Sequence, residues 1–452
     1  MKRKGTRMIC LTLAGLLCWS VPVQPLTAET LQEDRTATDS TVTGSDAGAK
    51  EMDTLLFGDN EEEVMESVDV SSMLYQAGGL GIPAQEDYGI AAYAMISQEE
   101  QENLKNDILR ALEAGTETLD ISGYNIPTEN GAELSSLFTQ VVNENPKLFY
   151  VTGGLRYWKN QTIYTRLEFS YSEVTDEQKA AFSAKLGEAA SLVTSAMSEE
   201  EKALVLHDYL AQHCAYAYEE YSNGTLTSGS DEYNAYGALV NGKAVCQGYS
   251  EAYQALLQEV GIQSRICSSD AMNHAWNVVL IDGSWYHVDV TWDDPLNERN
   301  SKEYFGVVFH KYFLLSDKGM KKNGHNGGNL GLAKDTKYDN AYWNKVENEF
   351  CYQSGKFVFA DKTGIYTRKS LTAGKAECIK KLAIQGMVQK SGGKYYVLAK
   401  NQIYLFRLNN KKLTSIYKAP SGCTLLELKY SKKTLHFRYR KNGRNYTKTV
   451  KG

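Results

Sequence analysis

The sequence predicts an α+β protein in which a helix that begins at a cysteine packs on an antiparallel sheet, followed by an all-β C-terminal domain. Three observations predict this class. Apolar residues recur at three- and four-residue spacing after Cys246, and an Asp-Gly turn at 282–283 separates two strand-like runs. Short alternating runs continue from about residue 350 to the end. A length of 452 residues exceeds one ordinary core, so several domains are expected.

The N-terminal region has the composition of a targeting sequence followed by a linker. Residues 1–28 combine a basic start, a largely apolar run and the small-residue site Leu26-Thr-Ala28, which predicts a cleaved signal peptide. An uncleaved anchor is the alternative. Residues 29–95 are rich in Ser, Thr, Gly and acids, and we expect an acidic, disordered linker. The protein is therefore expected to be secreted or associated with the cell surface, without a membrane span in its mature form.

Residues 96–198 are expected to form an α+β subdomain that carries no chemical motif. Ser97 and Glu100 have the spacing of a capping box, which starts a helix that runs to about Leu112. Further along the chain the patterns predict a helix over 132–142, a strand that starts at 148, a strand over 162–170 and a helix over 175–197.

Residues 199–345 are expected to form the catalytic core, which begins with a helix over 199–215. The next helix starts at Cys246, and Gly261 stands where a helix ends on a glycine. A cysteine at a helix N-terminus is close to unpaired N–H groups and to the positive end of the helix dipole, which favour a thiolate. A buried structural cysteine is the alternative for this residue taken alone.

A β-hairpin is expected over 274–292, with its two-residue turn at Asp282-Gly283. This turn places Asp289 opposite Trp276 and on the same face as His274, two residues away. Diagonal neighbours on one face are within reach of each other. A three-residue loop would send them to opposite faces. Cys246, His274 and Asp289 therefore have the order and setting of a nucleophile, a base and an orienting acid.

These phrases resemble the transglutaminase-like superfamily, the papain-like cysteine enzymes, and in particular its bacterial secreted branch. The phrases that carry the resemblance are 235–249 around Cys246, Asn273-His-Ala-Trp-Asn277 and Trp285-Tyr-His-Val-Asp-Val-Thr-Trp-Asp293. Weaker likeness extends to His207-Asp-Tyr-Leu upstream and to 312–317 with His325 downstream. The resemblance covers about 200–330 and implies a papain-like core with Cys246, His274 and Asp289 as the triad. It leaves open whether the protein is a transferase, a protease, a deamidase or an inactive binding module.

Three more residues are candidates for supporting roles. Tyr236 precedes the nucleophile by ten residues, and its phenol is either an oxyanion donor or a core aromatic. Gln247 follows the nucleophile and is a second oxyanion candidate. Trp276 is expected beside the triad. No CxxC or HxxxH pair and no regular cysteine spacing is present, so we expect no metal, no cofactor and no disulfide framework, with the pairing of the other cysteines left open.

Residues 346–452 are expected to form a basic all-β domain, either a small β-sandwich or an incomplete propeller. Between residues 351 and 452, 23 Lys and Arg residues stand against three acids, a formal charge of +20. The net charge of the chain is −6, so the rest carries −26. A solvated basic surface is one interpretation, and binding to an anionic cell-wall polymer or glycan is the other. Nucleic acid is not expected as a partner.

The function predicted from these features is that of a secreted cysteine acyltransferase or cysteine protease acting on a protein or peptide. Cys246 would form a thioester from a glutamine carboxamide or a peptide amide. Transfer to an amine gives cross-linking, and transfer to water gives deamidation or proteolysis. The alternative is a catalytically weak transglutaminase-like binding module held at the cell surface by its basic tail.

Overall fold

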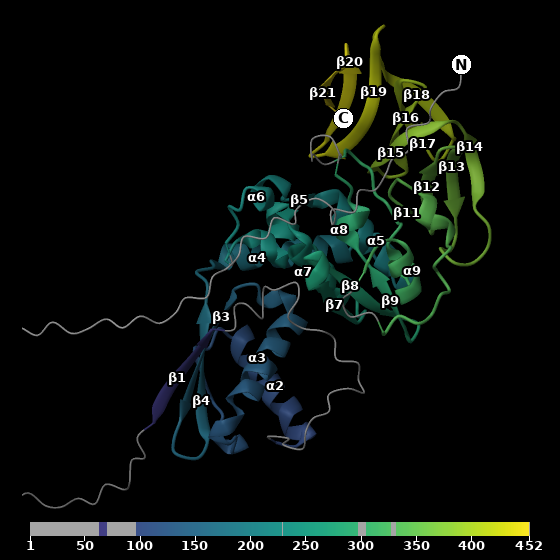
Figure 1. The fold of residues 1–452 in the computed structure, drawn as a ribbon. Helices are drawn as coiled ribbons and strands as arrows, with labels where there is room; N and C mark the ends of the chain where they lie inside the picture. The colour runs from purple at the N-terminus through teal and green to yellow at the C-terminus, as the bar shows by residue number, and fades with distance from the viewer. Residues whose placement is uncertain (1–62, 70–95, 228, 297–303, 327–330, 452) are drawn as a thin grey trace, which may run out of the picture.

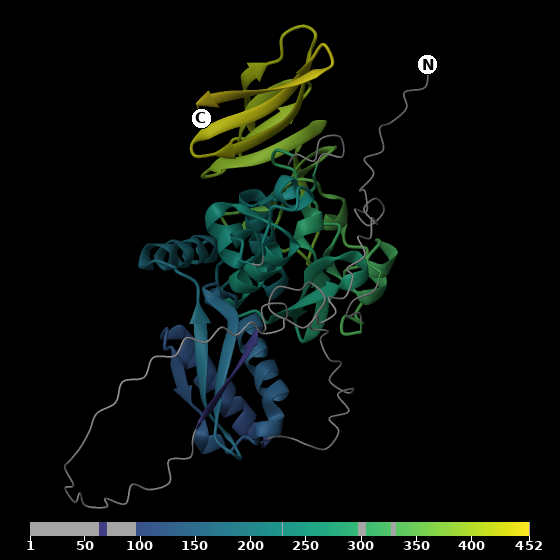
Figure 2. The same ribbon diagram turned by 60° about the vertical axis from the view of Figure 1, so that its left-hand side comes forward.

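The computed structural model describes residues 63–69, 96–227, 229–296, 304–326 and 331–451. Three regions follow one another along the chain: an N-terminal α+β part, a central part around α7, and a C-terminal part made of strands (Figure 1). Figure 2 shows the same order from a second side, with the C-terminal strands and the N-terminal part at opposite ends of the central part. No helix in the described ranges has the length and apolar character needed to cross a membrane.

The N-terminal part is a four-stranded antiparallel sheet packed on two helices. Its helices are α2 (Gln98–Glu113) and α3 (Gly131–Glu144), and its sheet has the order β1-β3-β4-β2. These strands are β1 (Val64–Asp69), β2 (Thr118–Asp120), β3 (Val151–Lys159) and β4 (Tyr164–Tyr171). The predicted capping box starts α2, since Ser97 and Glu100 bond reciprocally. The strand expected from 148 starts at 151, because Pro146 begins a 3₁₀ turn over Pro146–Leu148.

One short stretch of the expected linker is ordered. β1 pairs with β3 over six residues and adds a strand to the sheet edge. Lys159 forms an ion pair with Glu66 at 2.8 Å, and the β1 side chain Val68 packs against the subdomain core. The expectation of a disordered linker is therefore wrong for 64–69, which pairing with the edge of the sheet orders. The signal-peptide prediction and the other linker residues, 29–62 and 70–95, lie outside the described residues.

The central part packs α7 between helices and a four-stranded antiparallel sheet of order β10-β9-β8-β7. The helices are α4 (Asp176–Ala190), α5 (Glu199–His213), α6 (Tyr218–Ser222), α7 (Cys246–Glu259), α8 (Val290–Asp293) and α9 (Asp317–Lys322). The strands are β5 (Ala215–Tyr216), β6 (Lys243–Ala244), β7 (Ser264–Ser269), β8 (His274–Ile281), β9 (Ser284–Val288) and β10 (Phe313–Leu315). Most α7 side chains are buried, so this helix lies inside the core rather than on its surface. The helix expected over 175–197 ends at 190.

The C-terminal part consists of three antiparallel sheets, each made of consecutive strands. The first holds β11 (Cys351–Gln353), β12 (Lys356–Asp361), β13 (Gly364–Arg368) and β14 (Glu377–Lys381). The second holds β15 (Ile384–Ser391), β16 (Lys394–Ala399), β17 (Gln402–Arg407) and β18 (Lys412–Lys418). The third holds β19 (Cys423–Ser431), β20 (Thr434–Lys441) and β21 (Arg444–Lys451). A repeat of meander sheets is nearer to the propeller-like alternative than to a two-sheet sandwich.

Alternation along β16 explains how the sheets stack. Tyr395 and Val397 contact the first sheet, whereas Tyr396 and Leu398 contact the third. The middle sheet is therefore buried on both faces. On the first sheet, Phe357 and Phe359 belong to the core of the central part. Residue 346, the predicted domain boundary, thus lies inside a continuous packed region.

Candidate active site

The site is built on the N-terminus of α7, where Cys246 is the first helical residue. The residue before it, Val245, provides no side-chain cap, and the first turn contains no acid. The N–H groups of this turn therefore keep their hydrogen-bonding capacity, and the dipole end is not neutralised. Both features stabilise negative charge on a sulfur or on an oxyanion beside it.

The chain before α7 is held close to the helix start. Val245 N–H donates to the carbonyl of Glu232 at 2.9 Å, and β6 pairs in parallel with β5. Gly248 makes this approach feasible, because a Cβ there would lie 2.6 Å from the Glu232 carbonyl oxygen. Glycine at this position is thus required by the close packing of the backbone against α7.

The hairpin has the predicted register. Asp282 and Gly283 both have positive φ, as a type I′ turn requires, and Asn277 pairs with Val288. His274 and Asp289 consequently share one face, and His274 Nε2 lies 2.7 Å from Asp289 Oδ2. The Cys246 thiol also interacts with the His274 side chain, and this interaction raises the pKa of His274. Since Nε2 faces the carboxylate, Nδ1 is the nitrogen left for the sulfur.

Asp289 is held rigidly at the end of the hairpin. It is the N-cap of α8, where its Oδ1 accepts from Trp292 N–H at 3.0 Å. Its own N–H donates to the Tyr312 carbonyl at 3.2 Å. The relative exposures of Asp289, His274 and Cys246 are 0, 5 and 8 %, so the three groups interact in a largely water-free environment.

Burial and the neighbouring negative charge shift the pKa of His274 in opposite directions. Burial disfavours the imidazolium, but the Asp289 carboxylate and the interaction with Cys246 outweigh it and raise the pKa of His274 to about 10. For Asp289, burial raises the pKa, whereas His274 and His325 together lower it well below its usual range. The geometry thus favours a charged His274–Asp289 pair at neutral pH.

Trp276 lies beside the triad, as the hairpin register predicts. Its ring stacks on His274 at 5.7 Å between centroids, and Trp292 stacks on the same imidazole at 5.2 Å. Its Nε1–H donates to His287 Nδ1 at 3.0 Å. The indole is buried, so it both packs the core and limits the orientation of His274.

The other two supporting candidates have contacts elsewhere. Tyr236 stacks on Phe149 at 4.9 Å and belongs to the main apolar cluster, which favours the core-aromatic interpretation over an oxyanion donor. The amide Nε2 of Gln247 donates to Glu251 Oε1 at 2.9 Å, one turn further along α7. Neither side chain has a described contact with His274 or Asp289, and we do not propose either as an oxyanion donor.

Three tyrosines near the nucleophile were missed by the sequence reasoning. Tyr216, Tyr221 and Tyr233 all interact electrostatically with Cys246. Burial is the main cause that raises the pKa of each, and the interaction with Cys246 contributes to it. They therefore remain protonated hydrogen-bond donors at neutral pH. The Tyr221 hydroxyl accepts from Asn273 Nδ2 at 2.6 Å, which links α6 to the residue before His274. No spacing pattern marks these residues, since the fold alone brings them to Cys246.

His325 is a second histidine on the triad carboxylate. Its Nε2 lies 2.7 Å from Asp289 Oδ2, the oxygen that also faces His274. The family resemblance included His325 as part of a closing segment, but nothing in the sequence indicated a contact with Asp289.

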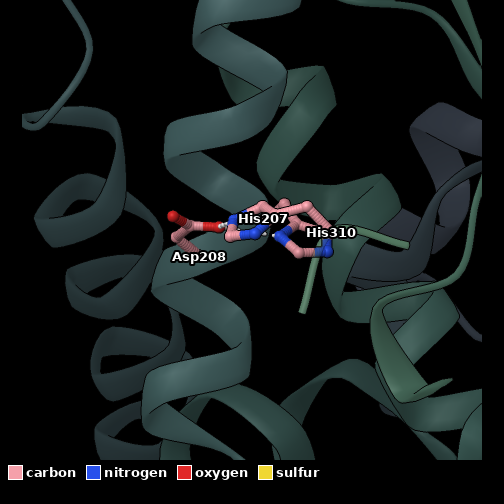
Figure 3. A group of neighbouring side chains, drawn as sticks. All are labelled: His207, Asp208 and His310. Atoms are coloured by element: carbon pink, nitrogen blue, oxygen red, sulfur yellow. Dashed lines mark hydrogen bonds and ion pairs between the residues drawn. The ribbon is translucent and has the colours of Figure 1, made fainter. Parts of the chain in front are cut away.

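A separate buried cluster contains His207, Asp208 and His310 (Figure 3). His207 Nδ1 and His310 Nε2 both lie within 2.9 Å of Asp208 Oδ1, and His207 Nε2 lies 3.2 Å from Asp293 Oδ2. Burial opposes the charge on His207, but Asp208 and Asp293 raise its pKa to about 9. Asp293 ends α8 and also accepts from the backbone N–H of Tyr312, so the cluster fixes the segment that begins at Asp289.

Among the described residues, two groups of ligand atoms are close enough to hold a metal ion, namely His207–Asp208–His310 and His274–Asp289–His325. In both groups the distances between nitrogen and oxygen are 2.7–2.9 Å, which are hydrogen-bond distances. Each of these atoms already has a protein partner. Hydrogen bonding therefore accounts for both groups, and the absence of a metal stays a prediction.

The six described cysteines are free, and Cys378 is the exposed one among them. No disulfide therefore stabilises the described part of the chain. The exposure of Cys378 also provides an internal reference for thiol reactivity.

Comparison with known proteins agrees with the family resemblance. Residues 188–290, which include Cys246, His274 and Asp289, match the family model described as the transglutaminase-like superfamily. The resemblance inferred from the motifs is thus confirmed for the central part, whose core is transglutaminase-like. No curated protein sequence matches the chain.

Solved structures with local similarity cover a minority of the chain. A crystal structure of a TGase is 18 % identical and has a TM-score of 0.23. The match covers 31 % of this chain and 44 % of the TGase chain. A candidate cysteine protease from Cytophaga hutchinsonii is 14 % identical, with a TM-score of 0.20. The match covers 30 % of this chain and 56 % of the protease chain. The N-terminal domain of Nup159 is 9 % identical, with a TM-score of 0.17. The match covers 39 % of this chain and 41 % of the Nup159 chain. The chain spans about half the length of the structures that it matches.

Proposed function

We propose that the chain is a secreted cysteine acyl-transfer enzyme whose nucleophile is Cys246. The observation that carries the proposal is the position of His274, whose Nε2 hydrogen-bonds the Asp289 carboxylate and whose side chain also interacts with the Cys246 thiol. A helix start without a capping side chain supplies backbone donors beside the sulfur. A binding module would need no such constellation.

In the first half-reaction, the Cys246 thiolate attacks the carbonyl carbon of a glutamine carboxamide or peptide amide. The new C–S bond places negative charge on the carbonyl oxygen, which the N–H groups at the α7 start stabilise. The imidazolium of His274 then gives its proton to the leaving nitrogen as the C–N bond breaks. Ammonia or an amine departs, and a thioester remains on Cys246.

In the second half-reaction, His274 removes a proton from the incoming nucleophile. An amine yields a new amide bond and so a cross-link, whereas water yields a carboxylate. Cys246 leaves as a thiolate and the His274–Asp289 pair is restored. The acceptor that reaches the thioester thus decides between transferase and hydrolase activity.

Activity on a glutamine-containing peptide, with and without an added primary amine, tests the proposal. We expect ammonia release in both cases and incorporation of the amine in the second. Cys246→Ala should abolish both, while Cys378→Ala, which removes the exposed thiol, should leave them unchanged. Release of ammonia that survives Cys246→Ala would overturn the proposed nucleophile.

Thiol labelling provides a test that needs no substrate. At pH 6 iodoacetamide should modify Cys246 faster than the far more exposed Cys378, because only Cys246 has a histidine partner. Labelling in the order of exposure would contradict the activated nucleophile.

We further propose that the basic tail retains the protein on an anionic cell-wall polymer or glycan. The formal charge of +20 supports this, as does the exposure of Lys441, Arg444 and Lys448 on the last hairpin. Their triple Gln variant should elute from an anionic wall polymer at lower salt with unchanged turnover. Lys318, Lys321 and Lys334, exposed outside the tail, provide the matched control. Equal elution of both variants would leave the basic surface without this role.

A further inference from the structure

We propose that His325 is a positioning residue for the triad: a neutral, permanent hydrogen-bond donor that fixes the Asp289 carboxylate. The inference rests on the proposed cysteine chemistry and adds a fourth side chain to it. Asp289 Oδ2 faces two histidine nitrogens at once, His274 Nε2 and His325 Nε2, each at 2.7 Å. Trp292 N–H donates to Oδ1 at 3.0 Å, so three donors hold the carboxylate and both of its oxygens have a partner.

The surroundings of His325 keep it neutral. Its ring is fully buried against Trp292, Trp276 and Tyr312, with centroids 4.2–5.0 Å apart. Its Nδ1 is buried and has no hydrogen-bond partner among the described residues. A proton on Nδ1 would therefore be a buried N–H without an acceptor, which is costly. The neutral tautomer with its proton on Nε2, facing Asp289, satisfies the geometry.

One carboxylate thus holds two histidines that carry different charges. Burial lowers the pKa of His325, and the neighbouring charge of His274 lowers it further, although Asp289 opposes both. The same carboxylate, together with the interaction with Cys246, raises the pKa of His274. When the environments of two titratable groups move their pKa values in opposite directions, the two groups take different roles. His274 carries the mobile proton, and His325 keeps its own.

The position of His325 is fixed by a segment that is independent of the hairpin. Its backbone N–H donates to the Met320 carbonyl at 3.1 Å, and the next residue, Asn326, donates to Met272 Sδ at 3.2 Å. Met272 lies in the turn that leads into His274. The segment therefore ties the far side of the carboxylate to the base that it orients.

The consequence is that Asp289 cannot rotate without breaking a bond to His325. A fixed carboxylate keeps His274 Nε2 occupied and Nδ1 directed at the thiol. The His325 bond also withdraws charge from the carboxylate, which limits how tightly the carboxylate holds the His274 proton. Without His325, this proton should be released to a leaving group less readily.

Two variants separate the hydrogen bond from the volume of the ring. His325→Phe keeps a planar ring between the indoles and removes the donor, whereas His325→Gln keeps an N–H that can reach Asp289. His436→Phe, in the C-terminal part, is the control for the same change elsewhere. Near-UV circular dichroism monitors packing, and His325→Met replaces the Phe variant if the latter does not fold, because methionine fills irregular gaps.

The readout is the rate of Cys246 alkylation by iodoacetate as a function of pH. This reagent is an anion, so its rate falls when the His274 imidazolium loses its proton, whereas neutral iodoacetamide serves as the comparison. In His325→Phe we expect the alkaline edge of the iodoacetate profile to move up by about one pH unit, the size of one lost bond to a carboxylate. Turnover should fall about tenfold or more. His325→Gln and His436→Phe should keep the wild-type edge.

The outcomes distinguish this inference from the function on which it rests. Wild-type Cys246 that shows no rapid alkylation at pH 6 would overturn the proposed nucleophile itself. Rapid alkylation in the wild type with an unmoved edge in folded His325→Phe would overturn the role of His325 alone. An equal shift in His325→Gln would also overturn it, because the effect would then not depend on the donor.

Discussion

Replacing Asp289 by Asn tests the electrostatic logic of the site most directly. The two side chains have nearly the same shape, so packing is preserved and one charge is removed. Asp289 accepts three hydrogen bonds, from Trp292 N–H on Oδ1 and from His274 and His325 on Oδ2. An amide has a single acceptor oxygen and therefore cannot satisfy both sides of this position.

The expected loss follows from the state of His274. Without the carboxylate, burial dominates and the pKa of His274 falls from about 10, so the imidazolium is no longer stable at neutral pH. If the amide nitrogen faces Nε2, the neutral ring must also place its proton on Nδ1, where it cannot take one from the thiol. We expect kcat/KM to fall ~10³- to 10⁴-fold, as in other triads that lose this charge. This corresponds to about 4–5.5 kcal/mol of transition-state stabilisation.

Stability should change with pH in a defined window. The raised pKa of His274 contributes stability that is complete below its unfolded value of 6.5 and disappears as pH rises through about 10. The lowered pKa of Asp289 contributes stability that is present above 3.8 and disappears on acidification. The difference in Tm between wild type and Asp289→Asn should therefore be largest near pH 5–6 and shrink towards pH 10.

The assays are kcat/KM on the glutamine peptide, iodoacetamide labelling of Cys246 against pH, and thermal unfolding at several pH values. Labelling of Cys246 at neutral pH should be slower in the variant than in the wild type, because the imidazolium beside the sulfur is lost. Cys246→Ala sets the background. Turnover within about threefold of the wild type would refute the reasoning, because His274 would then be oriented by another group.

Three further variants test individual contacts of the site. Tyr236→Phe should change kcat/KM less than twofold, because the ring packs on Phe149, whereas a large loss would restore the oxyanion role. Gly248→Ala places a Cβ 2.6 Å from the Glu232 carbonyl and should destabilise the protein by about 1–3 kcal/mol, measured by urea unfolding; an unchanged midpoint would contradict the close approach. Trp276→Phe loses the bond to His287 and should lower kcat more than KM rises, while a pure KM effect would indicate a substrate contact instead.

The part of the site that is local in sequence was predictable. The Asp-Gly turn sets the register of the hairpin, and register alone decides that His274 and Asp289 share a face. The helix start at Cys246 follows from the apolar spacing and from the glycine at 261, which has positive φ. These features depend on turn chemistry and periodicity, which a single sequence carries.

Contacts between distant segments were not predictable in the same way. His325, Tyr216 and Tyr221 reach the site only because separate segments fold onto it, and none of them has a spacing relation to Cys246. Tyr236 shows the converse. Its closeness in sequence to the nucleophile suggested a catalytic role, but the chain turns its ring into the core beside Phe149.

The tail shows why charge and packing must be considered separately. Its composition predicts a detachable basic domain, yet Phe357 and Phe359 of β12 share an apolar core with the central part. Phe350 N–H also donates to Asp208 at 2.6 Å, within the buried cluster that holds α8. Truncation near residue 350 would remove these phenylalanines, expose the part of the central core that they cover and leave Asp208 short of a donor. It should therefore lower turnover through stability alone. Substitution of exposed lysines and arginines on the last hairpin removes charge without touching that core, and therefore separates adhesion from folding where truncation cannot.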